Sequence, residues 1–164
     1  MDLFQIALAL STLLCSLVAG FLFAFVIVAM PGIGALNDHD FLQAFKVMDR
    51  VIQNNQPIFI LVWAGSVILL AITAVLSIWH LEGVNRLLII GAAAIYFFAV
   101  QLPTVIVNVP LNNQLQAQSL SSMNESELQV ARKQFEPRWV RWNAIRTIFA
   151  IVTSTLLIIL LIRL

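Results

Sequence analysis

The sequence has little charge. Only 10% of its 164 residues are Asp, Glu, Lys or Arg, whereas ordinary soluble domains contain about 25%, and 61% of the residues are hydrophobic. A composition this apolar excludes a water-soluble globule. The net charge is only +1 and the basic residues form no long run, so the sequence predicts no nucleic-acid partner.

Cysteine and histidine are also scarce. Cys15 is the only cysteine, so the chain alone cannot build an internal disulfide or a thiolate metal cluster. The two histidines, His39 and His80, lie on either side of the long apolar stretch 57–79, which argues against a histidine-based metal site within one chain. Glycine-rich phosphate loops and nucleophiles with an evident base nearby are missing too. We therefore expect no metal site and no cofactor.

What the chain does contain is a set of long apolar segments, at about 3–30, 57–79, 84–107 and 142–162. Each is long enough to cross a hydrocarbon core of ~30 Å as a helix. Backbone groups in lipid must satisfy their own hydrogen bonds, and the segments lack the strict alternation of barrel strands. The sequence therefore predicts an all-α fold, with residues 1–164 forming one integral membrane domain, a four-helix bundle.

The connections between these segments differ in length. The middle one, at 80–83, is short and forces an antiparallel hairpin. In the first long connection, Asp38 offers a cap to a helix that ends near Gln53. Its apolar residues share one face, which predicts an amphipathic helix that lies on the bilayer surface or caps the bundle. These residues are Phe41, Phe45, Met48 and Ile52.

The last connection is the most polar part of the chain. Asn124 followed by Glu127 has the spacing of a helix N-terminal capping box, and Pro137 suits the first turn of a new helix. We therefore predict a short helix in this connection, a corner at Glu136-Pro137, and then the long fourth helix.

The distribution of basic residues predicts the orientation. Positive residues favour the cytoplasmic side of a membrane. The long connections carry most of them, namely Lys46, Arg50, Arg132, Lys133, Arg138 and Arg141, against Arg86 and Arg163 on the other side. We therefore expect both long connections in the cytoplasm and both termini on the opposite side, in a bacterial inner membrane or an endomembrane.

Polar residues recur at helical spacing along the end of the third segment. Gln101, Thr104 and Asn108 are three and then four residues apart, which places them on one stripe. Pro103 and Pro110 disturb the helix there and leave backbone carbonyls that amide side chains or a ligand can use. Asn112 follows just beyond. These asparagines either contribute to a polar site or simply cap a kinked helix end.

The fourth segment begins with a similar stripe of Trp139, Asn143 and Arg146, with Trp142 beside it. An interfacial belt explains the two tryptophans, because an indole has an apolar body and one hydrogen-bond donor. It explains Asn143 and Arg146 less well. A guanidinium at membrane depth either reaches back to the surface or needs a carboxylate, carbonyl groups or a bound anion.

The hairpin topology brings the end of the third helix and the start of the fourth to the same membrane face. We therefore predict a polar pocket that is roofed by the first long connection and is formed by Asn108, Asn112, Asn143 and Arg146. Asp49 falls on the inner side of the amphipathic helix and is a candidate counter-charge for Arg146. His39 is either a base at the pocket mouth or a solvated loop histidine.

Two motifs carry a resemblance to a known family. The run Asn108-Val109-Pro110-Leu111-Asn112, followed by Trp139-Val140-Arg141-Trp142-Asn143-Ala144-Ile145-Arg146, resembles the anthrone oxygenase-like family of small four-helix membrane proteins. Met30-Pro31 and residues 54–59 are similar to the same family, so the likeness covers nearly the whole chain. Its named members oxidise an anthrone to an anthraquinone with molecular oxygen.

The resemblance implies an oxygenase that acts on a lipophilic aromatic compound of the anthrone or quinone type without metal or flavin. Such chemistry needs an apolar slot, a base and donors that stabilise an enolate oxygen. The catalytic candidates are then His39, Asp49 and Arg146, and the ligand-binding candidates are Gln101, Asn108, Asn112, Trp139, Trp142 and Asn143. The alternative is a non-catalytic lipid- or quinone-binding protein or a structural subunit. Expected partners are membrane lipid and a lipophilic small molecule, and a homo-oligomer stays open.

Overall fold

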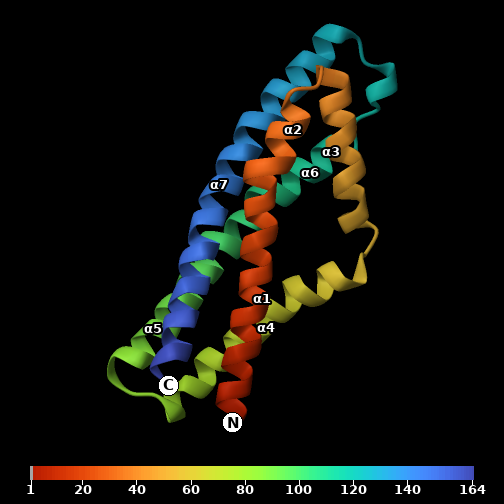
Figure 1. Ribbon diagram of the computed structural model, residues 1–164. Helices are drawn as coiled ribbons and strands as arrows, with labels where there is room; N and C mark the ends of the chain where they lie inside the picture. The colour runs from red at the N-terminus through yellow and green to blue at the C-terminus, as the bar shows by residue number, and fades with distance from the viewer. Residues whose placement is uncertain (1) are drawn as a thin grey trace.

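The computed structural model describes residues 2–164 and shows helices joined by short loops, with no strand in that range. Its long apolar helices are long enough to cross a membrane (Figure 1). They comprise Leu3–Gly34, Pro57–His80, Gly83–Gln116 and Glu125–Arg163. The predicted all-α membrane bundle is therefore confirmed.

The first two spans begin at capping residues and end in tight turns. Asp2 caps α1 (Leu3–Ala24) by accepting a hydrogen bond from the Gln5 backbone N–H at 2.8 Å. Pro57 opens α4 (Pro57–His80), where its missing N–H costs nothing. The hairpin then turns into α5 (Gly83–Ile95) through Gly83, whose positive φ of 52° suits a residue without Cβ.

Three π-helical segments widen the first and third spans, and a proline follows each of them two residues later. Pro31 follows η1 (Phe25–Ala29), Pro103 follows η2 (Tyr96–Gln101) and Pro110 follows η3 (Thr104–Asn108). A proline cannot donate to the carbonyl four residues back, and its ring clashes with that carbonyl, so a wider turn relieves the conflict.

The third span is consequently longer than the sequence predicted. It continues through η3 into α6 (Val109–Gln116) and does not end near residue 107. The prolines in this part of the chain change the helix type without terminating the helix. The first span likewise extends through η1 into α2 (Met30–Gly34).

The predicted amphipathic helix is α3 (Asp38–Gln53), which lies alongside the upper part of the bundle in Figure 1. Phe41 and Phe45 are buried as expected, whereas Arg50 is exposed. Lys46 is buried although it lies away from the apolar face, because the loop after α6 covers it and its ammonium donates to the Gln118 carbonyl. Burial lowers the pKa of Lys46.

The predicted corner at Glu136-Pro137 is wrong. One continuous helix, α7 (Glu125–Arg163), begins at the predicted cap and runs through Pro137, so the predicted short helix is the first part of α7. The 3-10 turn η4 (Leu120–Ser122) precedes it. Phe135 and Trp139 flank Pro137, and the Phe45 ring lies 4.6 Å and 5.1 Å from their rings. A corner would separate these contacts, and Pro137 itself lies on the exposed face of α7. The predicted capping box of Asn124 and Glu127 does form.

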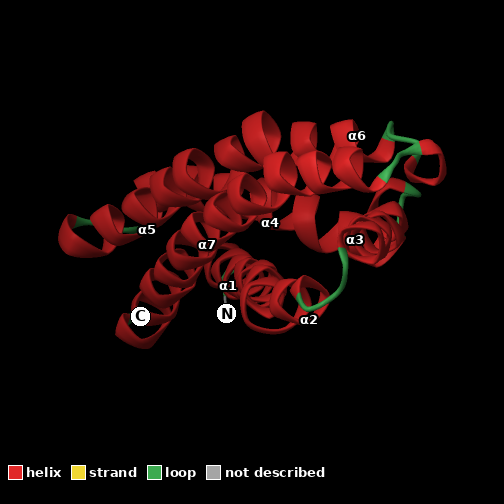
Figure 2. Cartoon of the chain, turned by 90° about the horizontal axis from the view of Figure 1, so that it is seen from above, coloured by secondary structure: helices red, strands yellow, loops and turns green. Residues whose placement is uncertain are grey.

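The buried side chains form two clusters along the bundle. The lower cluster joins α1, α4, α5 and the second half of α7, with Leu8, Leu70 and Leu157 fully buried. The upper cluster joins α3, α6 and the first half of α7 around Phe41 and Phe135. The view from above shows α3 at one end of the molecule and α5 at the other (Figure 2). The candidate site lies between the two clusters.

Candidate functional site

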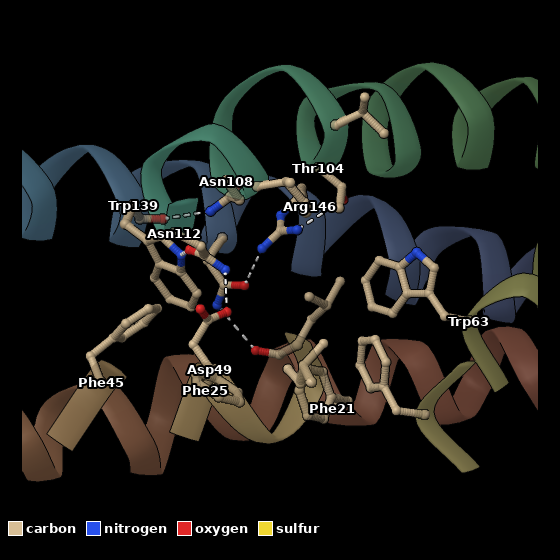
Figure 3. Close-up of a pocket in the computed structure, with 16 residues that line it drawn as sticks. Phe21, Phe25, Phe45, Asp49, Trp63, Thr104, Asn108, Asn112, Trp139 and Arg146 are labelled. Carbon is tan, nitrogen blue, oxygen red and sulfur yellow. Dashed lines mark hydrogen bonds between the residues drawn. The ribbon is translucent and has the colours of Figure 1, made fainter. Parts of the chain in front are cut away.

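A cavity of about 280 Å³ lies between the two hydrophobic clusters and is lined by 16 residues (Figure 3). They come from α1, η1, α3, α4, η3, α6 and α7. Most of the lining side chains are aromatic or aliphatic, and a few polar groups converge at one end. This combination of apolar walls and few polar groups is typical of small-molecule sites.

Arg146 is the most unusual of the polar groups, because it is a cation that is only 3% exposed. Its Nη1 donates to Thr104 Oγ1 at 2.8 Å and its Nη2 donates to Asn143 Oδ1 at 2.8 Å. No ion pair within residues 2–164 includes Arg146, and its buried Nε donates to no acceptor there. The guanidinium therefore does not reach the surface, and its positive charge stays uncompensated at membrane depth.

Two asparagines hold the helices around this arginine. Asn143 Nδ2 donates to the Leu22 carbonyl at 3.2 Å, which ties α7 to α1. Asn108 Nδ2 donates to the Trp139 carbonyl at 3.4 Å, which ties η3 to α7. The buried Asn108 Oδ1 accepts no hydrogen bond from the part of the chain that the structure describes. The third and fourth helices thus bring their polar stripes together.

Asp49 reaches the cavity from α3 and is also buried. Its Oδ1 accepts a hydrogen bond from Asn112 Nδ2 at 2.8 Å. Its Oδ2 accepts from Gln53 Nε2 at 2.7 Å and from Gln116 Nε2 at 2.8 Å. Three amide donors therefore stabilise this carboxylate, because hydrogen bonds to the charged form replace lost hydration.

The hypothesis that Asp49 pairs with Arg146 is therefore wrong. Amide groups donate hydrogen bonds to the Asp49 carboxylate, while the Arg146 guanidinium donates to neutral oxygens. Both side chains nevertheless line the same cavity, and Figure 3 shows them reaching into it from different helices. A cation and a carboxylate thus face a shared space without neutralising each other.

Aromatic rings build the remaining walls. Trp139 donates its Nε1–H to Asn112 Oδ1 at 2.8 Å, and its ring lies 5.6 Å from that of Phe25. Farther down, Phe59 stacks on Trp63 at 5.3 Å, and Trp63 Nε1 donates to Gln101 Oε1 at 3.0 Å. These side chains give the cavity aromatic walls, against which an aromatic ligand can stack.

The cavity brings together most of the predicted site residues, namely Asp49, Asn108, Asn112, Trp139, Asn143 and Arg146. Gln101 touches the site only through its bond to Trp63, and Trp142 packs against the upper cluster. Neither of these two lines the cavity.

His39 also lies outside the cavity, which corrects its assignment as a candidate base. Its half-exposed ring lies at the start of α3 and hydrogen-bonds to Asp40 at 3.0 Å. That bond, together with one from Asn37, lowers the pKa of Asp40. Asp49 lies about three turns farther along α3, on the inner face, and is the carboxylate that reaches the cavity.

Sequence reasoning missed several lining residues. Thr104 was recognised on the polar stripe but not as a partner of Arg146. The aromatic walls were also missed, although Phe21 and Phe25, like Phe59 and Trp63, are spaced four residues apart. That spacing places each pair on one helical face, at the end of its span that lies beside the polar stripe. It is the signal that could have identified them.

No group of three or more His, Cys, Asp or Glu side chains suited to a metal ion occurs within residues 2–164. Residues 45–156 of the chain match the family model described as anthrone oxygenase. The match covers more than half of the 164 residues and includes both the polar stripe of the third span and that of the fourth. The curated proteins and the solved structures gave no match.

Proposed function

Because the chain belongs to the anthrone oxygenase family, we propose that it is a membrane-embedded oxygenase acting on a lipophilic aromatic compound of the anthrone or quinone type. One observation carries this proposal. A buried guanidinium and a buried carboxylate line the same aromatic-walled cavity without pairing. An enzyme that removes a proton from carbon and stabilises the resulting enolate needs these two groups, held apart by the width of a substrate.

The reaction starts with proton removal. The Asp49 carboxylate takes a proton from the acidic methylene of the substrate, and the electron pair delocalises onto the ketone oxygen. Arg146 stabilises the negative charge on that oxygen, and Asn108 and Asn143 position the substrate and the guanidinium. Because these donors are fixed before the substrate arrives, little reorganisation is needed during the reaction.

Molecular oxygen is the oxidant. The carbanion transfers electrons to O₂ and forms a carbon–oxygen bond, which gives a hydroperoxide after protonation by Asp49. Loss of water then converts the former methylene into a carbonyl. Each turnover consumes one O₂, oxidises one CH₂ to one C=O and releases one water. The closed end of the cavity keeps bulk water away from the carbanion.

The direct test is oxygen consumption by the purified protein in lipid nanodiscs supplied with anthrone, with anthraquinone followed by absorbance. We expect Asp49→Asn to reduce turnover to background and Arg146→Gln to lower kcat/KM about 100-fold or more.

The matched controls Asp40→Asn and Arg141→Gln change exposed residues on the same two helices and keep the activity. A wild-type rate equal to autoxidation of anthrone contradicts the proposal. Binding of anthrone without product would favour the lipid- or quinone-binding alternative.

We also propose that the two long connections face the cytoplasm and that both termini face the opposite side. The excess of Lys and Arg in those connections supports this orientation. Ser126 is exposed in the last connection, and the native Cys15 is buried. In intact cells, a membrane-impermeant thiol reagent should therefore leave Ser126→Cys unlabelled until the membrane is opened. Labelling before opening would reverse the orientation.

A further inference from the structure

The cavity is closed at its polar end and open at one side. Asn108, Asn143 and Arg146 are all buried. On the far wall, Val105 is 64% exposed and Val109 is exposed as well, although both line the cavity. Phe59 and Trp63, which face them from α4, are partly exposed. The opening therefore lies between the first turns of α4 and the η3–α6 stretch.

The path of α4 explains why this side is open. Figure 1 shows that the first turns of α4 lie apart from the third span, whereas its later turns lie near α1 and α5. Side-chain hydrogen bonds from α4 reach the third span at Trp63–Gln101 and Ser66–Tyr96. None joins α4 to η3 or α6 in the described part of the chain. No side-chain hydrogen bond therefore closes the opening between α4 and the η3–α6 stretch in the described residues.

The surroundings of the opening are apolar. Its two sides belong to the spans Pro57–His80 and Gly83–Gln116, and the adjacent Leu102 and Ile106 are exposed. A surface of this kind within a membrane span faces lipid hydrocarbon. A charged molecule is costly at that depth, whereas a neutral aromatic molecule partitions into it readily.

We propose that the cavity takes its ligand sideways from the hydrocarbon interior of the bilayer, through the opening between Phe59 and Trp63 on one side and Val105 and Val109 on the other. The ligand class is a planar aromatic compound that crosses the opening uncharged and becomes an anion only at the closed end, beside Arg146. Calling this ligand a substrate rests on the proposed function. The access route itself rests only on the geometry.

Thiol labelling tests the route without needing catalysis. Leu22 lines the cavity and is 2% exposed, and the native Cys15 gives the background because it is buried. In liposomes, we expect N-phenylmaleimide dissolved in the membrane to label Leu22→Cys at least about ten-fold faster than a permanently charged methanethiosulfonate reagent added to the water on both sides. Equal or faster labelling by the charged reagent would overturn the proposal.

A second substitution locates the opening. Val105→Trp narrows it and should slow labelling of Leu22→Cys by the membrane-dissolved reagent several-fold. Ile106→Trp is the matched control, since Ile106 is the next residue, is 56% exposed and lies outside the cavity lining. Equal rates in the two tryptophan variants would contradict the assigned position. Phe25→Cys, on the same wall, replaces Leu22→Cys if that variant does not fold.

The two proposals fail separately. If wild-type protein does not accelerate anthrone oxidation but the labelling pattern holds, the oxygenase assignment is wrong and the lateral opening stands. If anthrone is oxidised but the charged reagent labels as fast as the lipophilic one, the enzyme stands and its substrate arrives from water.

Discussion

The buried position of Arg146 lowers the stability of the folded protein. A guanidinium within a membrane helix is costly, by about 2.5 kcal/mol at the centre of the helix even on the lowest scale and by less toward its ends. Its partners Thr104 and Asn143 are neutral and offset only part of this cost. A chain selected only for stability would place an apolar residue here. The charge therefore points to an anionic group that arrives from outside the protein.

This reasoning predicts an unusual mutational pattern at residue 146. Arg146→Met keeps a similar side-chain length and removes the buried charge, so we expect a melting temperature in detergent equal to or above that of the wild type. The orphaned Asn143 Oδ1 offsets part of the gain, by about 1–3 kcal/mol. Oxidation of anthrone should nevertheless be lost. A fall of more than about 3 kcal/mol in the free energy of unfolding would instead show that Arg146 holds the fold together.

Arg146→Lys separates charge from geometry. Lysine keeps the positive charge but presents one ammonium group, so it cannot bond Thr104 and Asn143 in the same two-pronged way. We expect it to recover only part of the activity that Arg146→Met loses. Full recovery would show that the site needs only the charge, and no recovery would show that the fixed orientation is essential.

The sequence predicts which polar residues of the site lie together when those residues belong to the same helix. Spacing placed Asn143 with Arg146 on one stripe and Gln101, Thr104 and Asn108 on another, and the hairpin topology brought the stripes together. The partner of Asp49 was not predictable in this way. Its amide donors come from α3 and α6, and the choice between them and Arg146 depends on distances between elements that no periodicity specifies.

At the scale of helices, the prolines have different effects. Pro31, Pro103 and Pro110 each follow a π-helical segment, whereas Pro137 lies within a helix that stays α-helical on both sides. The sequence marks each of these positions as a disturbance. It does not say whether the disturbance widens the helix, ends it or is simply tolerated, because packing of neighbouring side chains decides between these outcomes.

Alanine substitution should separate these effects. Pro137→Ala restores a backbone donor on an exposed helix face, so we expect a gain of about 1–3 kcal/mol in stability and unchanged anthrone oxidation. Pro110→Ala removes the reason for the wide turn of η3 (Thr104–Asn108). Closing that turn by one residue would rotate Thr104 by about 100° relative to Asn108, which is one step of an α-helix.

Thr104 and Asn108 could not then both keep their hydrogen bonds to α7, the first with Arg146 and the second with Trp139. We therefore expect Pro110→Ala to lower turnover about ten-fold or more, with the melting temperature and the oxidation rate measured for both variants. A destabilised Pro137→Ala would show that the proline is required to seat Phe135 and Trp139 against Phe45. An unaffected Pro110→Ala would show that the π-helical turn is not needed by the site.

The number and type of the long helices could be predicted because hydrophobic length is a property of the sequence itself. Their ends could not, since two of them depend on packing. α6 extends the third span beyond residue 107, and α7 passes through the expected corner. Phe45, which is distant in sequence, stabilises that second extension by contacting rings on both sides of Pro137.

For the whole molecule, the cavity coincides with the boundary between the two hydrophobic clusters. The first, third and fourth spans run through both clusters, whereas α4 belongs to the lower one and α3 to the upper one. Leu22 and Trp139 line the cavity from different clusters. A ligand in this position contacts both hydrophobic clusters and fills the space between them.

Ligand binding should therefore stabilise the entire bundle. We expect anthrone, added without oxygen so that it is not consumed, to raise the free energy of unfolding by about 2.7 kcal/mol at 100 times its Kd. For a chain of this size, that corresponds to roughly 5–10 °C in melting temperature. Arg146→Met should show a smaller shift because it cannot stabilise the enolate, whereas Arg141→Gln, which changes an exposed residue of the same helix, should match the wild type. Equal shifts in all three proteins would place the ligand somewhere other than this cavity, because Arg146 lines the cavity and Arg141 does not.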